Sequence, residues 1–537
     1  MNKVITADQA VALIKDEATV AWTTAGMSFF AEEVAMALEK RFLEKGSPRN
    51  LTLVHDCGCG DSKTRGMGHL SHEGLVRRLV SGHTGQAPLM GQLIAENKIQ
   101  AYLLPQGVLA TLWRQIAGRK PGVITKVGIG TYVDPRQDGG KASAKTTEEL
   151  VKIIELEGEE WLLYKSFPVD VAVIRATTAD EKGNLTMEEE SMLAEALPMA
   201  QAARNSGGIV IAQVKYLASA NTLHPKDVKI PGVLVDYVVI AKPENHMQTM
   251  GTLYNPGLAG HIKVPLASLL PMVFGDRKII ARRAAMELAP SMIVNLGIGV
   301  PDGVASVAAE EGVAHLFTLT TELGTYGGIP AAGADFGSAY NAEAIIEHEA
   351  QFDFYDGGGL DAAFLGLAQT DMEGNLNVSK FGSKIVGPGG FINISQGSKK
   401  VIFCGTLTNG AHLDFSGGRV RVIAEGKTKK FVNKVDQITF SGKFAENARI
   451  PVLYITERAV FELKGGALTL IEIAPGMDLD RDILAAMEFT PHISPTLKEM
   501  PAELFQEKWG RLKQIMESRT STAQASPSDK KMELEVI

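Results

Sequence analysis

A faint internal duplication constrains the fold of this 537-residue chain more than any other feature of its sequence. Residues 169–187 read VDVAVIRATTADEKGNLTM, residues 360–378 read LDAAFLGLAQTDMEGNLNV, and six of these nineteen positions match. The matches include Asp170 with Asp361, Asp180 with Asp371, and the two GNL triplets. Each block has the pattern of a buried strand, a polar turn and a second strand. A further apolar strand follows each block at a nearly constant offset, GGIVIAQV and KKVIFCGT, so the pattern predicts two copies of one α/β unit.

The beginnings of the two copies also agree. ATVAWTTAG and SMIVNLGIG are both apolar strands that end in small residues, and a helical pattern follows each. This alternation predicts the fold class α/β, with two similar open halves whose mostly parallel sheets are covered by helices on both faces. A stretch rich in Pro, Gly and Met separates the halves, and the C-terminal end has little to bury. The predicted segments are an N-terminal domain over 1–243, a linker over 244–275, a C-terminal domain over 276–518 and a disordered tail over 519–537.

Composition and charge exclude several classes of protein. The three cysteines, Cys57, Cys59 and Cys404, argue against a disulfide framework and for structural thiols in a reducing cytoplasm. The N-terminus lacks the apolar core of a signal peptide, and no apolar run approaches the length that spans a bilayer, so no membrane is expected. A net charge of −8 makes nucleic acid an unlikely partner. The lysines of EGKTKK, residues 425–430, favour a solvated surface, with a small polyanionic ligand as the alternative.

One acidic residue stands at an unusual position. In TTELGTYGG, a short β-rich stretch ends on Glu322 and then loosens into Gly324, Gly327 and Gly328. A carboxylate at the end of a buried strand is rigid and partly desolvated. The glycine turn is expected to let a bulky substrate approach it.

A second glycine turn lies upstream, in NLGIGVPDG, and contains Gly297 and Gly299. A strand, a glycine turn and a helix in this order predict backbone N–H groups that can receive an anion, although the glycines can also serve the turn alone. A Rossmann dehydrogenase would place a ribose-binding acid where Glu322 lies. The spacing G-x-G-x-x-x-G and the glycines after Glu322 count against that alternative.

Three further strings contain candidate site residues. Gln106, in LLPQGVL, follows an apolar run and can donate its amide to an oxyanion, or it can be an ordinary turn residue. VGPGGFINI, with Gly389 and Gly390, is a loop whose backbone an anion or a flat group can approach. Glu347, His348 and Glu349 are adjacent, so they cannot bind one metal together, and a solvated helix face is expected.

The chain resembles the family I coenzyme A transferases, and specifically the single-chain acetate/propionate CoA-transferases. The strings that carry the resemblance extend over about residues 1–515 and are PQGVL, GTYVDPRQDGGK, HPKDVKIPG, TELGTYGG, QFDFYDGGGLD, GNLNVSKFG, VGPGGF and YITERAVFEL.

The resemblance implies a role for individual residues. It makes Glu322 the catalytic nucleophile, Gln106 the side-chain donor to the oxyanion, and the Gly390 amide the second donor. Gly297, Gly299, Gly389 and Gly390 would contact CoA. Where many relatives have Ser-Glu-Asn-Gly around the nucleophile, this chain has Thr-Glu-Leu-Gly at 321–324, so the preference for an acceptor acid does not transfer.

The resemblance also implies the reaction: a ping-pong exchange through a covalent glutamyl-CoA thioester, between acyl-CoA and short-chain carboxylates such as acetate and propionate. It implies CoA as a substrate, no tightly bound cofactor, no metal, and a homotetramer or homodimer. The alternatives are an acyl-CoA thioesterase and a non-catalytic CoA-binding protein on the same fold.

Overall fold

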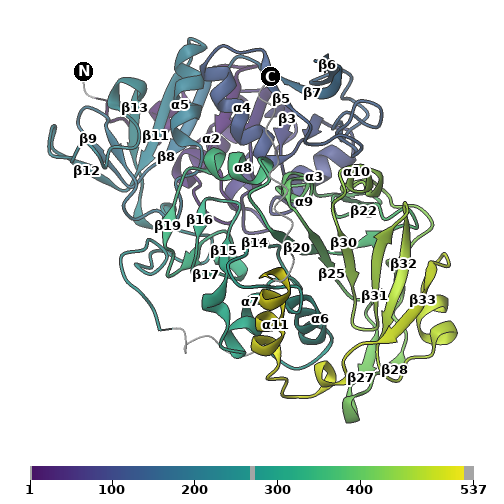
Figure 1. Ribbon diagram of the computed structural model, residues 1–537. Coiled ribbons are helices and arrows are strands. Elements are labelled where there is room, and N and C mark those ends of the chain that lie inside the picture. The colour runs from purple at the N-terminus through teal and green to yellow at the C-terminus, as the bar shows by residue number, and fades with distance from the viewer. Residues whose placement is uncertain (1–2, 266–271, 525–537) are drawn as a thin grey trace.

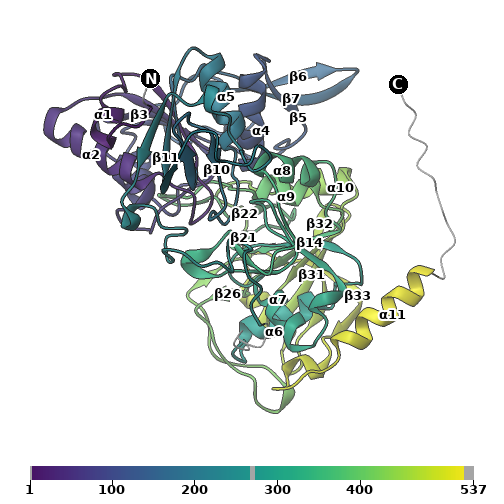
Figure 2. The ribbon, with the colours of Figure 1, turned by 90° about the vertical axis from the view of Figure 1, so that its left-hand side faces the viewer.

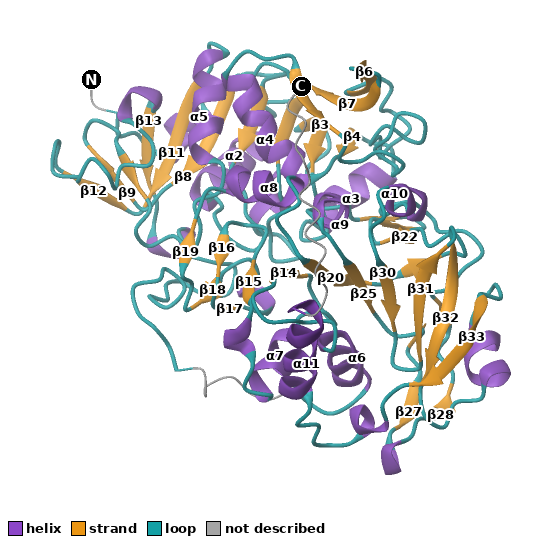
Figure 3. Cartoon of the chain, in the orientation of Figure 1, coloured by secondary structure: helices purple, strands orange, loops and turns teal. Residues whose placement is uncertain are grey.

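The duplication is visible in the structure, a computed structural model that describes residues 3–265 and 272–524. In Figure 1 the N-terminal half occupies the top of the molecule and the C-terminal half lies below it, and each half contains its own large sheet. Helices flank the sheet in both halves (Figure 3). The predicted α/β class with two similar, mostly parallel halves is therefore confirmed, whereas the domain boundaries themselves remain predictions.

The first sheet is parallel throughout, as its near-continuous apolar strands require. In spatial order its strands are β13 Tyr237–Ile240, β11 Ile209–Val214, β8 Val171–Arg175, β1 Thr19–Trp22, β2 Leu51–His55, β3 Val76–Ser81 and β4 Gln100–Leu103. The helices of this half are α1 Ala7–Val11, α2 Glu32–Lys45, α3 Pro88–Ala95, α4 Gln106–Ala117 and α5 Ala196–Asn205.

The second sheet has a parallel centre with antiparallel pairs on both sides of it, and its last pair, at the C-terminal edge, is again parallel. In spatial order its strands are β19 Ala344–Ile345, β16 Thr325–Tyr326, β15 Thr318–Thr320, β14 Ile293–Leu296, β20 Ala362–Gly366, β25 Val401–Cys404, β30 Val452–Ile455, β31 Ala459–Lys464, β32 Ala467–Ile473 and β33 His492–Glu499. The helices of this half are α6 Asp276–Ala285, α7 Gly303–Glu310, α8 His348–Asp356, α9 Phe391–Gly397, α10 Gly442–Asn447 and α11 Leu512–Gln524.

Both halves also contain small sheets, and the hairpin β6–β7 projects from the body (Figure 2). Their strands are β5 Gly122–Thr125, β6 Val151–Leu156 and β7 Glu159–Lys165; β9 Thr178–Asp180, β10 Leu185–Thr186 and β12 Tyr216–Ala218; β17 Ile329–Pro330 and β18 Ala339–Tyr340; β21 Gln369–Thr370 and β22 Leu376–Asn377; β23 Lys380–Phe381 and β24 Lys384–Ile385; β26 Thr408–Asn409 and β29 Thr428–Lys429; β27 His412–Asp414 and β28 Arg421–Ala424.

The matched aspartates explain why the duplication is readable in the sequence. The carboxylate of Asp170 accepts the backbone N–H of Thr19 at 2.8 Å, and the carboxylate of Asp361 accepts that of Ile293, also at 2.8 Å. Each contact attaches the start of β8 or β20 to the start of the neighbouring strand, β1 or β14. The same residue type therefore makes the same contact in both halves.

The second matched pair stabilises a turn. Asp180 accepts the backbone and side-chain N–H groups of Asn184, both at 2.9 Å. Asp371 accepts the same two groups of Asn375, at 3.1 and 3.2 Å. These bonds satisfy the backbone of the glycine turn in each GNL triplet, so the predicted strand–turn–strand unit is present twice.

Two predictions about the ends of the chain have different outcomes. The expected disorder from residue 519 is wrong for 519–524, because α11 continues to Gln524. The helix is attached to the body by the buried side chains of Leu512 and Met516 and by an ion pair between Arg519 and Glu287. The rest of the predicted tail, 525–537, lies outside the described residues.

The two halves share their cores at the boundary. Leu323 and Ile392 of the C-terminal half belong to a hydrophobic cluster of the N-terminal half, and Ala110 of the N-terminal half belongs to the cluster of the other. Hydrogen bonds also cross the boundary, such as that from Thr84 N–H to the Val386 carbonyl at 2.7 Å. Side chains at this boundary are therefore held by both halves.

Candidate active site

A cavity of about 240 Å³ lies where the carboxyl ends of strands from both halves meet. Its wall includes Leu296 and Gly297 at the end of β14 and Gly366 at the end of β20. His83, just beyond β3, and Gln106, beyond β4, come from the other half. Open parallel sheets bind ligands at this edge, so the fold itself predicts a site here.

Glu322 lies in this cavity, two residues beyond the end of β15. Burial raises the pKa of Glu322 above its ordinary value. The carboxylate is therefore stripped of part of its hydration. Such a carboxylate is more reactive as a nucleophile than one in water.

The residues after Glu322 fix its position. Leu323 is buried among the apolar residues of the N-terminal half, and this insertion joins the loop of Glu322 to the other half. Gly324 has a φ of +101°, and a side chain there would collide with the carbonyl oxygen of Ile346. The expectation that this glycine makes room for the substrate is therefore wrong: Gly324 serves the turn and its contact with Ile346.

Gln106 is the first residue of α4, and its side chain is completely buried. Its backbone N–H donates to the carbonyl of Gly389 at 2.9 Å, and its side-chain Nε2 lies 3.0 Å from Nε2 of His348. Gln106 is thus anchored by the C-terminal half and lies beside Glu322, as the sequence predicted. Its role as an oxyanion donor remains a prediction.

The Gly389–Gly390 loop packs directly against Glu322. Gly389 donates its N–H to the carbonyl of Gly82 at 2.8 Å, which attaches the loop to the N-terminal half. Gly390 precedes α9, and a Cβ at this position would collide with Oε2 of Glu322. Glycine at 390 therefore lets the carboxylate lie against the backbone.

This contact predicts a large effect for the smallest substitution. Gly390→Ala should lower kcat by roughly 100-fold, because displacing a reacting group by about 1 Å can cost that much. Gly275→Ala is the control, since a Cβ at Gly275 meets no atom within 4 Å and this glycine is not part of the cavity wall. Steady-state kinetics of both variants would test the contact, and a Gly390→Ala enzyme with the kcat of the control would contradict it.

The glycines of NLGIGVPDG differ in what they can do. Gly297 lines the cavity, and a Cβ there would lie 3.3 Å from Leu365, tighter than ordinary packing. The N–H of Gly299 instead donates to the carboxylate of Asp302 at 2.9 Å. The N–H of Gly299, which was expected to bind an anion, therefore binds a carboxyl group of the chain itself. Gly299 does not belong to the wall of the cavity.

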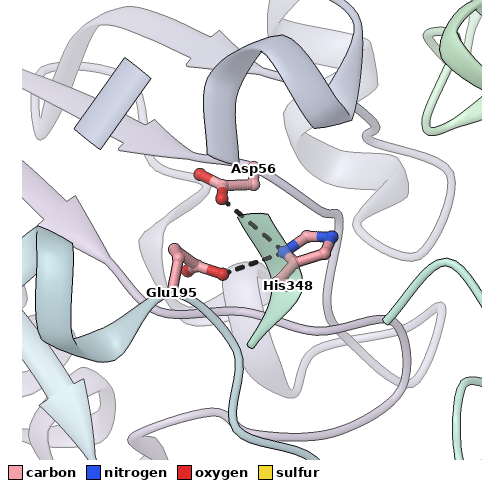
Figure 4. A group of neighbouring side chains, drawn as sticks. All are labelled: Asp56, Glu195 and His348. Atoms are coloured by element: carbon pink, nitrogen blue, oxygen red, sulfur yellow. Dashed lines mark hydrogen bonds and ion pairs between the residues drawn. The ribbon is translucent and has the colours of Figure 1, made fainter. Parts of the chain in front are cut away.

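The prediction of a solvated helix face at residues 347–349 is wrong for His348 and Glu349. His348 and Glu349 are buried rather than solvated, and His348 is completely so. His348 Nδ1 lies 3.1 Å from Glu195 and 3.8 Å from Asp56, and these two carboxyl groups are also fully buried (Figure 4). The cluster contacts Gln106 through His348. It was not predicted, because its members come from three distant parts of the chain.

The two acids of this cluster are not both ionised. Ligand atoms of Asp56, Glu195 and His348 lie within 4.8 Å of one another, which is also the spacing of a metal site. Burial together with the other acid raises the pKa of Asp56, and burial and Glu349 raise that of Glu195. Two carboxyl groups this close in a dry site do not both ionise, so a proton on one of them accounts for the arrangement without a metal.

The cysteines and lysines behave largely as the sequence indicated. Cys57 is buried, and its thiol accepts the N–H of Gly26 at 3.1 Å. Burial raises the pKa of Cys57 well above its ordinary value, as expected of a structural thiol. Lys427 is exposed, but Lys430 is partly buried, and burial lowers its pKa. Within residues 3–265 and 272–524, no helix has the length and apolar character that crossing a membrane requires.

Comparisons with known proteins agree with this geometry. The family model for coenzyme A transferase matches residues 4–241 and 277–483. A caffeate CoA-transferase of Acetobacterium woodii is 52% identical, covering 96% of this chain and 100% of its own length. Acetate CoA-transferase YdiF of Escherichia coli K12 is 46% identical, covering 94% of this chain and 95% of its own.

Solved structures give the same result. The acyl-CoA transferase YdiF apoenzyme from Escherichia coli O157:H7 superposes with a TM-score of 0.90 at 45% identity, covering 95% of this chain and 97% of that one. A second crystal structure of YdiF, described as a thioester complex with CoA, has a TM-score of 0.89 at 45% identity. This chain therefore belongs to the coenzyme A transferases, as a family I enzyme with both halves in a single chain.

Proposed function

We propose that this CoA-transferase exchanges CoA between short-chain acyl-CoA and free carboxylates such as acetate and propionate, through a covalent thioester on Glu322. The observation that carries the proposal is the carboxylate of Glu322 in the inter-half cavity, with Gln106 and Gly390 against it.

The first step forms a mixed anhydride. An oxygen of Glu322 attacks the carbonyl carbon of the acyl-CoA, a C–O bond forms, and the C–S bond breaks as CoA leaves as a thiolate. The thiolate then attacks the side-chain carbonyl carbon of Glu322, and the donor acid leaves as a carboxylate. The product is glutamyl-CoA, from which the acceptor carboxylate regenerates an acyl-CoA by the reverse steps. No proton is gained or lost overall.

Both attacks create a tetrahedral centre with a negatively charged oxygen. Gln106 Nε2 and the backbone N–H of Gly390 are the groups beside Glu322 that we assign to this oxygen. Preorganised donors of this kind stabilise the developing charge without reorganising at the moment of reaction. This assignment rests on the place of Gln106 and Glu322 in one cavity and on the contact between Gly390 and Glu322.

The choice of short-chain acids is supported by one relative and opposed by another. YdiF is an acetate CoA-transferase, whereas the Acetobacterium woodii relative is a caffeate CoA-transferase. The cavity of about 240 Å³ must also admit the thiol end of CoA, which favours a small acid. A panel of acetate, propionate and caffeate with acetyl-CoA as donor would test this choice, and a kcat/KM highest for caffeate would contradict it.

The same assay separates transfer from the two alternatives. A transferase makes propionyl-CoA from acetyl-CoA and propionate without releasing thiol. A thioesterase would release free CoA, which a thiol reagent detects, and a binding protein would do neither. We also propose a homo-oligomer, either a tetramer or a dimer, which the mass of the native protein in solution would test.

We assign the CoA phosphates to a second cavity of about 310 Å³ that adjoins the first. Ile298 and Gly366 line both cavities, and the ends of β20 and β25 form part of the wall. Two cations, Lys430 and Arg277, line this second cavity. Lys430 Nζ donates to Thr406 Oγ1 at 3.0 Å and is thereby positioned at the wall.

This assignment predicts a specific kinetic change. Lys430→Met should raise the KM for acyl-CoA by roughly 10-fold with little change in kcat, since hydrogen bonds to charged groups contribute about 1.5–3 kcal/mol. Lys427→Met, in the exposed part of the same lysine cluster, should behave as the wild type. Acyl-pantetheine lacks the phosphates, so the Lys430 variant should use it as well as the wild type does. An equal loss with acyl-pantetheine would contradict the assignment.

A further inference from the structure

The register of the two sheets makes Asp56 the counterpart of Glu322. Val20 of β1 pairs with Leu53 and with Val171, and Val294 of β14 pairs with Leu319 and with Ala362. Val171 and Ala362 directly follow the matched aspartates of the duplication, so Leu53 and Leu319 occupy equivalent positions. Asp56 lies three residues after Leu53, and Glu322 lies three residues after Leu319.

The helices extend this correspondence to the rest of the site. Gln106 begins α4, the helix before β8, and His348 begins α8, the helix before β20. Gly390 precedes the first residue of α9, and Glu195 precedes the first residue of α5; these helices lead into β25 and β11. Glu322, Gln106 and Gly390 thus correspond to Asp56, His348 and Glu195.

The second set has the same composition from the two halves. In each set, one half supplies two residues: the acid that follows a strand and the residue that precedes a helix. The other half supplies the third residue, which is the first residue of a helix. The duplication therefore produces two equivalent positions for an active site at the boundary. The cluster in Figure 4 occupies the second of these positions.

The second position is closed. Asp56, Glu195 and His348 are completely buried, whereas Glu322 lines a cavity. Where Gly390 leaves room for an oxygen of Glu322, Glu195 has a side chain, and its carboxyl group bonds His348 instead. Trp113 Nε1 donates to the other side of Asp56 at 2.6 Å. The cluster is therefore filled by its own side chains and has no room for an acyl-CoA.

The two positions touch through Gln106 and His348. Nε2 of Gln106 is an amide nitrogen and can only donate a hydrogen bond. Nε2 of His348, which lies 3.0 Å away, must therefore be the acceptor. The ring proton of His348 then lies on Nδ1 and donates to Glu195 at 3.1 Å. The second hydrogen of the Gln106 amide can then face Glu322, which lines the same cavity.

We infer that the closed counterpart of the active site positions Gln106, with His348 as the residue through which it acts. Without an acceptor at His348, the amide of Gln106 can turn over and present Oε1 to the nucleophile. Within the described part of the chain, Oε1 has no hydrogen-bond partner that would resist this rotation. An oxygen in that place would repel the oxyanion rather than stabilise it.

A double-mutant cycle tests this inference, which rests on the proposed function. His348→Leu removes the acceptor and should lower kcat by roughly 10- to 100-fold with little change in the KM for acyl-CoA. His348→Gln can still accept from Gln106 and donate to Glu195, and should recover kcat to within about threefold of wild type. His246→Leu, at another buried histidine, is the control for general loss of packing.

The decisive variant combines His348→Leu with Gln106→Ala. If His348 acts through Gln106, the double variant should be no slower than Gln106→Ala alone, because the two residues form one unit. Multiplied losses in the double variant would overturn the inference, as would a His348→Gln enzyme as slow as His348→Leu. Wild-type enzyme that forms no glutamyl-CoA would instead overturn the proposed function, so the two failures are distinguishable.

Discussion

Replacing Gln106 by alanine should lower kcat by about 10²- to 10³-fold and change the KM for acyl-CoA much less. The amide is buried in the same cavity as Glu322, and in the proposed mechanism it donates to a charge that develops only during the reaction, so its loss is expected in kcat. Losses of this size are typical when one donor of an oxyanion hole is removed. Steady-state kinetics at saturating acetyl-CoA and propionate would measure the effect.

The matched control is Gln115→Ala, which removes the same side chain from the same helix, α4, away from the cavity. It should leave both constants unchanged. A Gln106→Ala enzyme with nearly wild-type kcat would return Gln106 to an ordinary turn residue. A large rise in KM alone would show that the amide binds the substrate equally in the ground state and the transition state.

The sequence predicted the fold well because the duplication rests on local rules. Asp170 and Asp361 each bond the neighbouring strand, and Asp180 and Asp371 each stabilise a turn. Contacts of this kind require a particular residue type at a particular position, so the two halves have identical residues at equivalent positions. The strand, acid and glycines around Glu322 also form a short local pattern, although the predicted role of Glu322 came from the family resemblance.

The supporting cluster could not be predicted in this way. Asp56, Glu195 and His348 are distant in the sequence, and only the packing of the two halves brings them together. Their burial depends on both halves at once, so a polar triplet such as 347–349 reads as a solvated surface when it is taken alone. The one usable signal was the equivalence of Asp56 and Glu322, which requires the strand register.

The turn at Gly297 and Gly299 shows a further limit of local patterns. A strand, glycines and a helix usually present free N–H groups to an anion. Here Asp302 follows the glycines and accepts the N–H of Gly299, so an acid three residues away occupies one of the expected donors. The pattern specified the turn, but its function depended on a side chain outside the pattern.

The largest expected effect belongs to the nucleophile. Glu322→Gln should reduce CoA transfer by more than about 10⁴-fold, since losses of this order follow removal of a catalytic nucleophile. The amide has nearly the same shape, and the loop is fixed by Leu323 rather than by the carboxylate, so the variant should fold as the wild type does. Glu343→Gln, an exposed glutamate of the same half, is the control and should keep full activity.

Intact-protein mass spectrometry after mixing with acyl-CoA alone tests the covalent mechanism most directly. Without an acceptor acid, the wild-type chain should gain the mass of one CoA less one water, and added acetate should remove it. Borohydride should reduce the thioester and inactivate the enzyme permanently, but only after acyl-CoA has been added. The Glu322→Gln chain should gain no mass. A wild-type chain that transfers CoA without ever gaining this mass, or a Glu322→Gln chain that gains it, would contradict the assignment of Glu322 as the nucleophile.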